Sequence, residues 1–479
     1  MTCVFTFSVR IGIIWSVLVL GSCIFFVDLA YPQRKPNVIF INVDDLGWTD
    51  TGYQGSDFYE TPHIDRLAQS GMVFTQAYAG AANCAPSRAC LMSGQHTPRH
   101  GIYTVANSDR GPSRERKIIP TPNNEVLPEK ILTIAELFKM AGYTTGTFGK
   151  WHLGDDPKIQ GFDINVGGSH RGNPGKAGYL SPYKIDYIED GVAGEYLTDR
   201  LADEVLGFIR SYKNKPFFVY LPFYAVHTPL IGKELLVNQY KNKKVTNGHS
   251  NPVYAAMIET VDANVGKILA GLDALDLTDH TIIIFTSDNG GIRSISNQHP
   301  LRGGKGSYYE GGIRVPCIIK WPDQVAPAST SDYPIVNLDF FPTFREILGI
   351  ELNDNEMDGI SLLPLFRGEK LPQRPLYWHF PIYLQAYNPE KDDGRDPLFR
   401  TRPGSVVRLG DWKLHEYFED HGLELYNLSV DTGERNNLAG KKPEKTRELL
   451  TLLRQWRRHV KAPVPHEPNP QYNPEKVKH

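Results

Sequence analysis

Cysteine is scarce in this sequence, which excludes a fold held together by a disulfide framework. There are five cysteines in 479 residues; Cys3 and Cys23 lie near the N-terminus, which leaves Cys84, Cys90 and Cys317. If Cys84 is used for chemistry, Cys90 and Cys317 could form at most one disulfide. We expect both to be buried free thiols instead, since unpaired cysteine packs as a small apolar residue.

The net charge of the chain is also close to zero. The 52 Lys and Arg residues nearly balance the 54 Asp and Glu residues, and the formal charge of −2 gives no general basis for binding nucleic acid. Hydrophobic residues at 41% and charged residues at 22% are typical of globular proteins. A chain of 479 residues can form one large domain and a smaller one.

Only the N-terminus carries a long apolar run. Residues 11–20 follow Arg10 and have the length of a signal-peptide core. After Arg10, the next charged residue is Asp28. We therefore expect residues 1–30 to be a signal peptide of an exported protein, and the few cysteines favour the bacterial periplasm or secretion. Two alternatives stay open. Residues 20–23 resemble a lipoprotein cleavage box with Cys23 as the lipidated residue, and residues 11–27 could be an uncleaved anchor, although they are short for a membrane span.

Residues 36–365 alternate short apolar runs with stretches of helical spacing. Buried-strand runs occur at residues 37–43, 217–223 and 281–286, and residues 132–141 have helical periodicity. This alternation predicts an α/β fold: a large, mostly parallel sheet sandwiched by helices. We take residues 36–365 as the catalytic domain.

Residues 366–479 have a different pattern. Short strand-like runs at residues 376–379, 405–408, 412–415 and 423–426 predict a small antiparallel sheet, followed by a helix over residues 444–460 and a Pro-rich surface tail. We take this part as a C-terminal subdomain. The long polar segments 103–130, 155–195 and 382–402 are expected to shape a substrate pocket.

Two acidic clusters directly follow predicted strands. Asp44 and Asp45 come after residues 38–43, and Asp288 and Asn289 come after residues 282–287. The carboxyl ends of parallel strands meet at one edge of a sheet, so these side chains can converge there. Carboxylate and amide oxygens without His or Cys favour Ca²⁺, with Mg²⁺ less favoured. Each cluster alone could instead be turn-forming residues that cap helices.

The segment 82–94, Ala-Asn-Cys-Ala-Pro-Ser-Arg-Ala-Cys-Leu-Met-Ser-Gly, resembles the signature of the type I sulfatases, the formylglycine-dependent family within the alkaline phosphatase superfamily that includes arylsulfatases and N-acetylgalactosamine sulfatases. Residues 142–152, with Gly-Lys-Trp-His at their end, resemble the second sulfatase signature. Further matching segments follow in the expected order at residues 225–229, 286–291, 303–305 and 425–438. The likeness therefore runs from about residue 36 to 440, with Asn83 and Ser93 as small departures.

The resemblance implies a specific chemistry. A formylglycine-generating maturation enzyme would oxidise Cys84 to 3-oxoalanine (Cα-formylglycine), whose hydrate attacks the sulfur of a sulfate ester. One Ca²⁺ would be held by Asp44, Asp45, Asp288, Asn289 and residue 84. Arg88 and the cation would lower the pKa of the hydrate and fix the attacking oxygen.

The resemblance also implies roles for the remaining site residues. Lys150 and Lys305 would bind the sulfate oxygens and stabilise the charge of the transition state. His227, with help from Lys305, would protonate the departing alcohol. His152 would take the proton from the second hydroxyl so that sulfate leaves. Without the other motifs, either histidine could equally be structural.

The substrate follows less directly from the sequence. Export favours a sulfated carbohydrate over an aryl sulfate, and we expect no nucleic-acid partner and no membrane contact beyond an N-terminal anchor. Basic side chains in the long loops are candidates for further substrate contacts, although each could be a solvated surface residue: Arg114, Arg116, Lys117 and Arg302. Two rival functions remain: a phosphonate or phosphodiester hydrolase of the same superfamily, and a glycan-binding homologue without activity. The Asp288-Asn289 pair and the intact motif at Cys84 favour a sulfatase.

Overall fold

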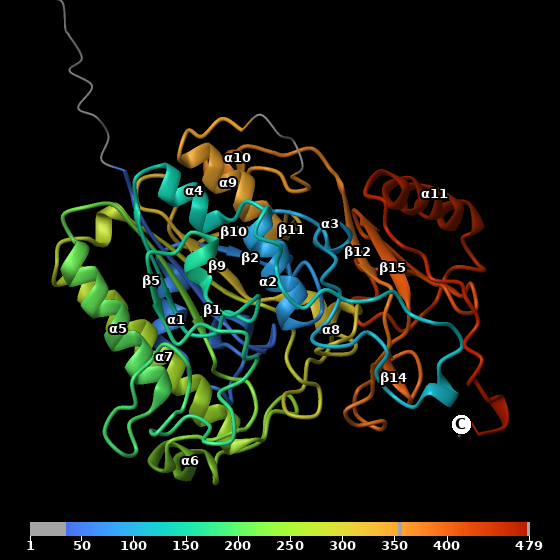
Figure 1. Ribbon diagram of the computed structural model, residues 1–479, viewed down its shortest axis with the longest axis horizontal. Helices are drawn as coiled ribbons and strands as arrows, with labels where there is room; N and C mark the ends of the chain where they lie inside the picture. Colours follow the sequence, from blue (N-terminus) through green and yellow to red (C-terminus); the bar gives the residue numbers. More distant parts are fainter. Residues whose placement is uncertain (1–34, 353–356, 477–479) are drawn as a thin grey trace, which may run out of the picture. The chain divides into compact units, whose positions relative to one another are not determined.

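The computed structural model describes residues 35–352 and 357–476 (Figure 1). The predicted signal peptide, with Cys3 and Cys23, lies outside the described residues, so export stays a prediction. Residues 36–479 form one compact unit.

An eight-stranded sheet forms the core of this unit. Its strands lie in the order β10 (Ser329–Ser331), β2 (Met72–Phe74), β9 (Cys317–Lys320), β7 (Thr281–Ser287), β1 (Asn37–Val43), β6 (Phe217–Phe223), β4 (Thr144–Phe148) and β5 (Ile164–Val166). β9 runs antiparallel to both of its neighbours, and the other pairs are parallel. The predicted mostly parallel sheet is therefore confirmed. Every residue of β1, β6 and β7 is buried, which explains their nearly continuous apolar sequences.

Helices cover both faces of this sheet (Figure 1). Ile39, Ile41 and Val43 of β1 belong to the apolar cluster that holds α1 (Pro62–Gln69), α5 (Leu197–Tyr212) and α7 (Pro252–Asp273). Val38 and Phe40, which point the other way, belong to the cluster that holds α2 (Cys84–Ser93), α4 (Ile134–Met140) and α9 (Phe340–Ile347). Shorter helices are α3 (Thr97–His100), α6 (Glu234–Tyr240), α8 (Glu310–Ile313) and α10 (Leu363–Phe366).

The C-terminal part forms the second predicted sheet. Its antiparallel strands lie in the order β12 (Pro375–Phe380), β15 (Gly404–Leu409), β16 (Trp412–Tyr417) and β17 (Leu423–Asn427). Helix α11 (Pro443–His459) packs on this sheet through Leu449, Leu453 and Trp456. Trp378 of β12 packs in one apolar cluster with Tyr78 and Ile313. This cluster joins the C-terminal sheet to earlier parts of the chain.

Small strands also occur where only loops or connections were expected. β11 (Ile335–Val336), β3 (Ala77–Tyr78) and β8 (Arg314–Val315) form a three-stranded sheet. β13 (Leu384–Gln385) and β14 (Phe399–Thr401) pair within the predicted loop 382–402. Two- and three-residue strands carry too few alternating positions to be recognised from a sequence pattern.

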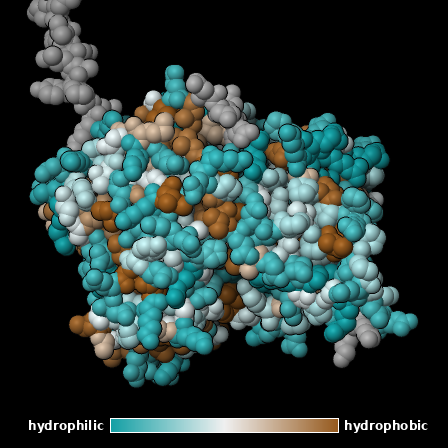
Figure 2. All heavy atoms as spheres, in the orientation of Figure 1, coloured by the Kyte–Doolittle hydropathy of each residue, from teal (hydrophilic) through white to brown (hydrophobic). Residues whose placement is uncertain are grey.

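The described surface carries no large apolar face in the view of Figure 2, where brown patches are separate and lie among hydrophilic side chains. Exposed apolar side chains such as Val192, Leu235 and Val430 come from distant parts of the chain. Of the helices that the structure describes, none combines the length and apolar character needed to cross a bilayer. Cys90 and Cys317 are buried free thiols, as expected from the sequence.

Candidate active site

The two acidic clusters meet at one end of the central sheet. β1 and β7 are parallel and Val43 lies opposite Ser287, so Asp44 and Asp288 leave neighbouring strands at the same level. The backbone N–H of Asp45 donates to Asp288 Oδ1 at 3.2 Å, and Asn289 Nδ2 donates to Asp45 Oδ1 at 2.8 Å. These side chains are almost completely buried. The predicted convergence of the two strand ends is therefore present.

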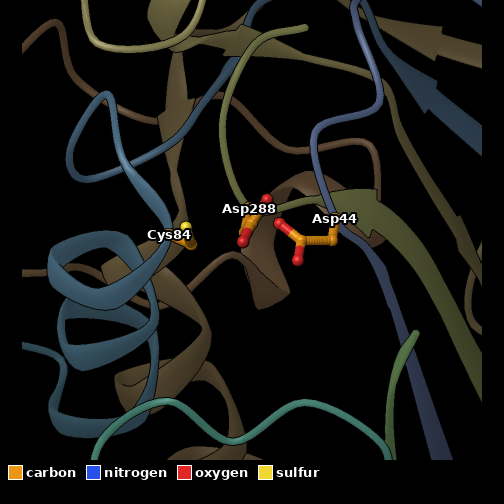
Figure 3. Close-up of side chains that lie close together, drawn as sticks. All are labelled: Asp44, Cys84 and Asp288. Atoms are coloured by element: carbon orange, nitrogen blue, oxygen red, sulfur yellow. The ribbon is translucent and has the colours of Figure 1, made fainter. Parts of the chain in front are cut away.

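Cys84 is the first residue of α2 and faces these acids. Figure 3 shows the side chains of Asp44 and Asp288 with Cys84 directed toward them from the start of the helix. One ligand atom from each of the three residues lies within 4.8 Å of the others. The N-terminus of a helix presents free N–H groups and a partial positive charge, which favours an anion bound beside residue 84.

Arg88 lies one helical turn after Cys84 and therefore on the same face of α2. Its Nε and Nη2 atoms each lie 2.9 Å from Asp288 Oδ2, and Nη1 donates to the backbone oxygen of Lys150 at 2.8 Å. Burial by itself would lower the pKa of Arg88, but Asp288 and Asp44 raise it well above its usual value. The guanidinium is thus a permanent positive charge that fixes three chain segments.

Two lysines bring further positive charge. Lys150 Nζ lies 2.5 Å from Asp44 Oδ2, and Lys305 Nζ donates to Asp45 Oδ2 at 2.8 Å. Gly149 places Lys150: its φ is +120°, and a Cβ there would lie 2.2 Å from the backbone oxygen of Pro222. Only glycine lets the chain leave β4 this close to β6.

The two predicted histidines are both neutral; His152 is buried, and the side chain of His227 is 14% exposed. His227 Nδ1 lies 2.6 Å from the backbone oxygen of Thr228, so Nδ1 carries a hydrogen, and Nε2 lies 3.7 Å from Asp45 Oδ2. Burial, followed by the charge of Lys305, lowers the pKa of His227 to about 3. Burial, followed by the charges of Lys150 and Arg88, lowers the pKa of His152 well below its usual value.

The carboxyl groups at the centre of the site have strongly shifted pKa values, and some oxygen atoms there lack a hydrogen-bond donor. Burial and the neighbouring Asp288 raise the pKa of Asp44 to about 8. Burial would also raise the pKa of Asp45, but the charge of Lys305 holds it well below its usual range. Asp44 Oδ1 and Asn289 Oδ1 are buried acceptors without a hydrogen-bond donor among the described residues. Unpaired oxygens beside repelling carboxylates are what a Ca²⁺ ion would satisfy, so the donor set fits the predicted metal.

The contacts given above connect the predicted acids and Asn289 with Cys84, Arg88, the two lysines and His227, whereas the predicted accessory basic residues have other partners. Arg116 and Arg302 are not solvated: Arg116 Nη1 donates to the backbone oxygen of Gly111 at 2.7 Å, and Arg302 Nη2 donates to that of Gly394 at 2.8 Å. The side chains of Arg114 and Lys117 are 54% and 40% exposed, and each lies within 4.0 Å of a glutamate.

Sequence reasoning missed two other arginines near the site, Arg110 and Arg400. Both lie in loops that were expected to shape the pocket. Nothing in the sequence distinguishes them from other loop arginines, because their position and partners depend on how distant parts of the chain pack.

One cavity of 1140 Å³ lies elsewhere, between β10 and residues 365–374. It is lined by Tyr333, Phe366 and Leu371 among others, and by none of the predicted site residues. Size alone therefore does not mark the reactive site in this protein. We take the cluster of acids, lysines and histidines around Cys84 as the candidate active site.

Comparison with known proteins agrees with this geometry. The family model described as Sulfatase matches residues 36–350, and the model for the C-terminal part of N-sulphoglucosamine sulphohydrolase matches residues 304–460. A sulfatase of Formosa agariphila is 35% identical, over 90% of this chain and 90% of that protein. N-acetylgalactosamine-6-O-sulfatase of Bacteroides thetaiotaomicron is 29% identical, over 89% and 94%.

Solved structures agree as well. The crystal structure of Ps i-CgsB in complex with k-i-k-neocarrahexaose has a TM-score of 0.72 and 30% identity, and the match covers 88% of this chain and 93% of that chain. The expectation raised by the motifs at residues 82–94 and 142–152 is confirmed. This chain is a member of the sulfatase family, the enzymes that hydrolyse sulfate esters.

Proposed function

We propose that this protein is an exported sulfuric ester hydrolase that releases inorganic sulfate from a sulfated carbohydrate. The observation that carries the proposal is the buried cluster of Asp44, Cys84 and Asp288 at the start of α2, with Arg88 fixed between them. Two relatives support a carbohydrate substrate, since one is an N-acetylgalactosamine-6-O-sulfatase and the other was solved with a neocarrahexaose. The predicted signal peptide supports action in the periplasm or outside the cell.

Residue 84 is the proposed nucleophile, after a maturation enzyme has converted Cys84 to Cα-formylglycine. The hydrated aldehyde would supply the hydroxyl that attacks sulfur. Arg88 stands one turn along the helix with its charge permanently in place, so it can stabilise a deprotonated oxygen at residue 84.

The residues that would hold Ca²⁺ are Asp44, Asp45, Asp288 and Asn289. Their fit rests on the unpaired Oδ1 atoms of Asp44 and Asn289. A bound divalent cation would offset the repulsion between the carboxylates and withdraw charge from a sulfate oxygen.

Lys150 and Lys305 are the proposed sulfate-binding residues. Each ammonium is already oriented by a carboxylate, so little reorganisation is needed when an anion arrives. His227 presents Nε2 on the side of Asp45 and Lys305, where it can pass a proton from the ammonium to the departing alcohol oxygen. His152 is neutral, as a base must be before it accepts a proton, and would deprotonate the second hydroxyl of residue 84.

The experiment is a mass measurement followed by an activity assay. The protein is produced together with a formylglycine-generating enzyme, and the peptide that contains residue 84 is weighed. The matured protein, with Cys84→Ala as control, is then incubated with 4-nitrophenyl sulfate and with sulfated mono- and oligosaccharides, and released sulfate is measured.

Sulfate release from sugars by the aldehyde form, and none by the control, would support the proposal. A matured protein that binds sulfated glycans without releasing sulfate would instead support the non-catalytic alternative. Efficient turnover of aryl sulfates alone would refute the carbohydrate assignment.

A further inference from the structure

Two loop segments are tied to the chain around Cys84. Asn83, which precedes Cys84, donates from Nδ2 to Thr104 Oγ1 at 3.3 Å. The N–H of Gly306 donates to the backbone oxygen of Ala82 at 2.7 Å, and Thr401 Oγ1 hydrogen-bonds to Gly306. The loop after residue 103 and the strand β14 are therefore both anchored beside the proposed nucleophile.

Arg400 extends from β14 toward this place. The residue is only 6% exposed, Nε donates to the backbone oxygen of Gln385 at 2.9 Å, and Nη1 donates to that of Lys305 at 2.8 Å. Its guanidinium lies 3.3 Å from the ring centre of Tyr387, which is 51% exposed. No hydrogen bond of Nη2 is found among the described residues, so this nitrogen can still donate to a ligand.

Arg110 approaches the same place from the other loop. Asp109 forms an isolated β-bridge with Tyr383, and a Cβ at Gly111 would lie 2.8 Å from Phe399 Cε1 and 3.5 Å from Gln385 Cβ, so residue 110 lies beside the β13–β14 pair. Its guanidinium hydrogen-bonds to the backbone oxygen of Val105. Burial lowers the pKa of Arg110; Tyr387 and Cys84 act against this effect, and Arg400 adds to it. Arg110 therefore lies beside the strand pair that carries Arg400, and the two positive charges repel each other.

Other arginines in the same part of the chain form ion pairs with carboxylates. Arg395 pairs with Asp420 at 2.7 Å, Arg435 with Asp393 at 2.6 Å, and Arg402 with Glu419 at 2.6 Å. Arg110 and Arg400 have no carboxylate within ion-pair distance among the described residues. Arg400 is buried and Arg110 is partly buried, and placing two like charges together without an acid is unfavourable unless an anion joins them.

We propose that Arg110 and Arg400 recognise an anionic substituent, a carboxylate or a second sulfate, on the substrate near the ester that is cleaved. This inference rests on the proposed function, because it places the anion on the alcohol part of a sulfate ester bound at residue 84. Arginine suits the task because its planar fork can bind either anion through two parallel hydrogen bonds. The enzyme would therefore prefer sulfated uronate-containing or multiply sulfated sugars to neutral sugars with one sulfate.

The test compares sulfate esters that differ in one anionic group. Phenyl sulfate, 3-carboxyphenyl sulfate and benzene-1,3-diyl bis(sulfate) are assayed with the matured wild type and with Arg110→Gln. Arg114→Gln is the matched control, since Arg114 lies in the same loop but is exposed and paired with Glu115. N-acetylgalactosamine 6-sulfate and its 4,6-disulfate provide the same comparison on a sugar. The aldehyde at residue 84 is verified by mass in every sample.

We expect Arg110→Gln to lower kcat/KM about 10- to 100-fold on the esters with an added anion, the size of a lost charge-assisted hydrogen bond, and to leave phenyl sulfate unchanged. Arg110→Lys should retain part of the preference. The ester whose kcat/KM falls more in Arg110→Gln shows whether the recognised anion is a carboxylate or a sulfate. Equal losses on all esters, or no loss on any, would overturn this assignment alone. A matured wild type that cleaves no ester would overturn the proposed function, and this assignment with it.

Discussion

Lys413 is predicted to be the most costly lysine to replace outside the active site. It is completely buried in β16, with Nζ 2.9 Å from Glu310 Oε1 and 3.0 Å from Glu434 Oε1, and both carboxylates are buried as well. Glu434 also accepts the N–H of Glu310 at 2.6 Å. The cluster joins the C-terminal sheet to α8, which follows the segment of Lys305.

Lys413→Met keeps the apolar stem and removes the charge. Breaking a buried ion pair by removing one partner costs about 3–5 kcal/mol, because the other charge is left uncompensated. Arg314 lies 3.7 Å from Glu310 and compensates part of its charge, so we expect a loss near the lower end, about 3 kcal/mol. Lys445→Met is the matched control. Its partner Glu448 is only 2.6 Å away, but the two side chains are 32% and 47% exposed, and the expected cost is below about 0.5 kcal/mol.

The pH dependence of the loss tests the reasoning further. Burial would raise the pKa of Glu310, but Lys413 is the main charge that lowers it to about 2. The ionised carboxylate of the wild type therefore contributes stability above pH 4.5 that is lost only as the pH falls toward 2. Without Lys413, burial raises the pKa of Glu310 in the folded variant, so this carboxyl binds a proton more readily. The difference in unfolding free energy between wild type and Lys413→Met should therefore shrink as the pH is lowered from 8 to 5.

The measurement is the free energy of unfolding from urea denaturation of wild type and both variants at the two pH values. A similar loss for Lys413→Met and Lys445→Met would refute the role given to burial. A deficit that does not change with pH would refute the uncompensated carboxylate as its cause.

Three further predictions concern helix α1, the metal and Arg88. Asp262 accepts the N–H groups of His63 and Ile64 at the start of α1, and burial raises its pKa from 3.8 to about 7. The wild type should therefore lose stability, at most about 4 kcal/mol, as the pH rises through this range. Asp262→Asn should remove that loss in thermal unfolding at pH 5 and 8, and Asp262→Ala should be destabilised at both. Adding Ca²⁺ at about 100 times its Kd to chelator-treated protein should stabilise it by about 2.7 kcal/mol, and Mg²⁺ by less; an unchanged Tm would argue against the metal site. Arg88→Lys cannot reproduce the two contacts with Asp288 and should lower kcat on 4-nitrophenyl sulfate by about two orders of magnitude, since a charge-assisted bond contributes about 1.5–3 kcal/mol; full activity would contradict its assigned position.

The convergence of the acids was predictable because it depends on local pattern and one topological rule. The apolar runs of β1 and β7 end directly before Asp44 and Asp288, and the ends of neighbouring parallel strands meet. The antiparallel direction of β9 was not predictable. Its residues 317–320 are an apolar run that fits either direction, and the choice depends on where the chain enters the sheet.

The contact partners of individual side chains could not be predicted from the sequence either. Arg302 was a candidate for binding a substrate anion, but it stacks on Tyr309 at 3.8 Å and donates to backbone oxygens. Arg400 looked like any loop arginine, but among the described residues its Nη2 has no hydrogen-bond acceptor. The difference lies in partners from distant parts of the chain, which periodicity does not encode.

The sequence by itself determined the family and the α/β architecture and indicated the candidate reacting groups, because these depend on residue types at short spacing. Only the tertiary structure decided which charges are compensated. Lys305 meets Asp45 across 260 positions of sequence, and Arg88 meets Asp288 across 200. The energy of such pairs depends on distance and burial, and both are properties of the packed chain.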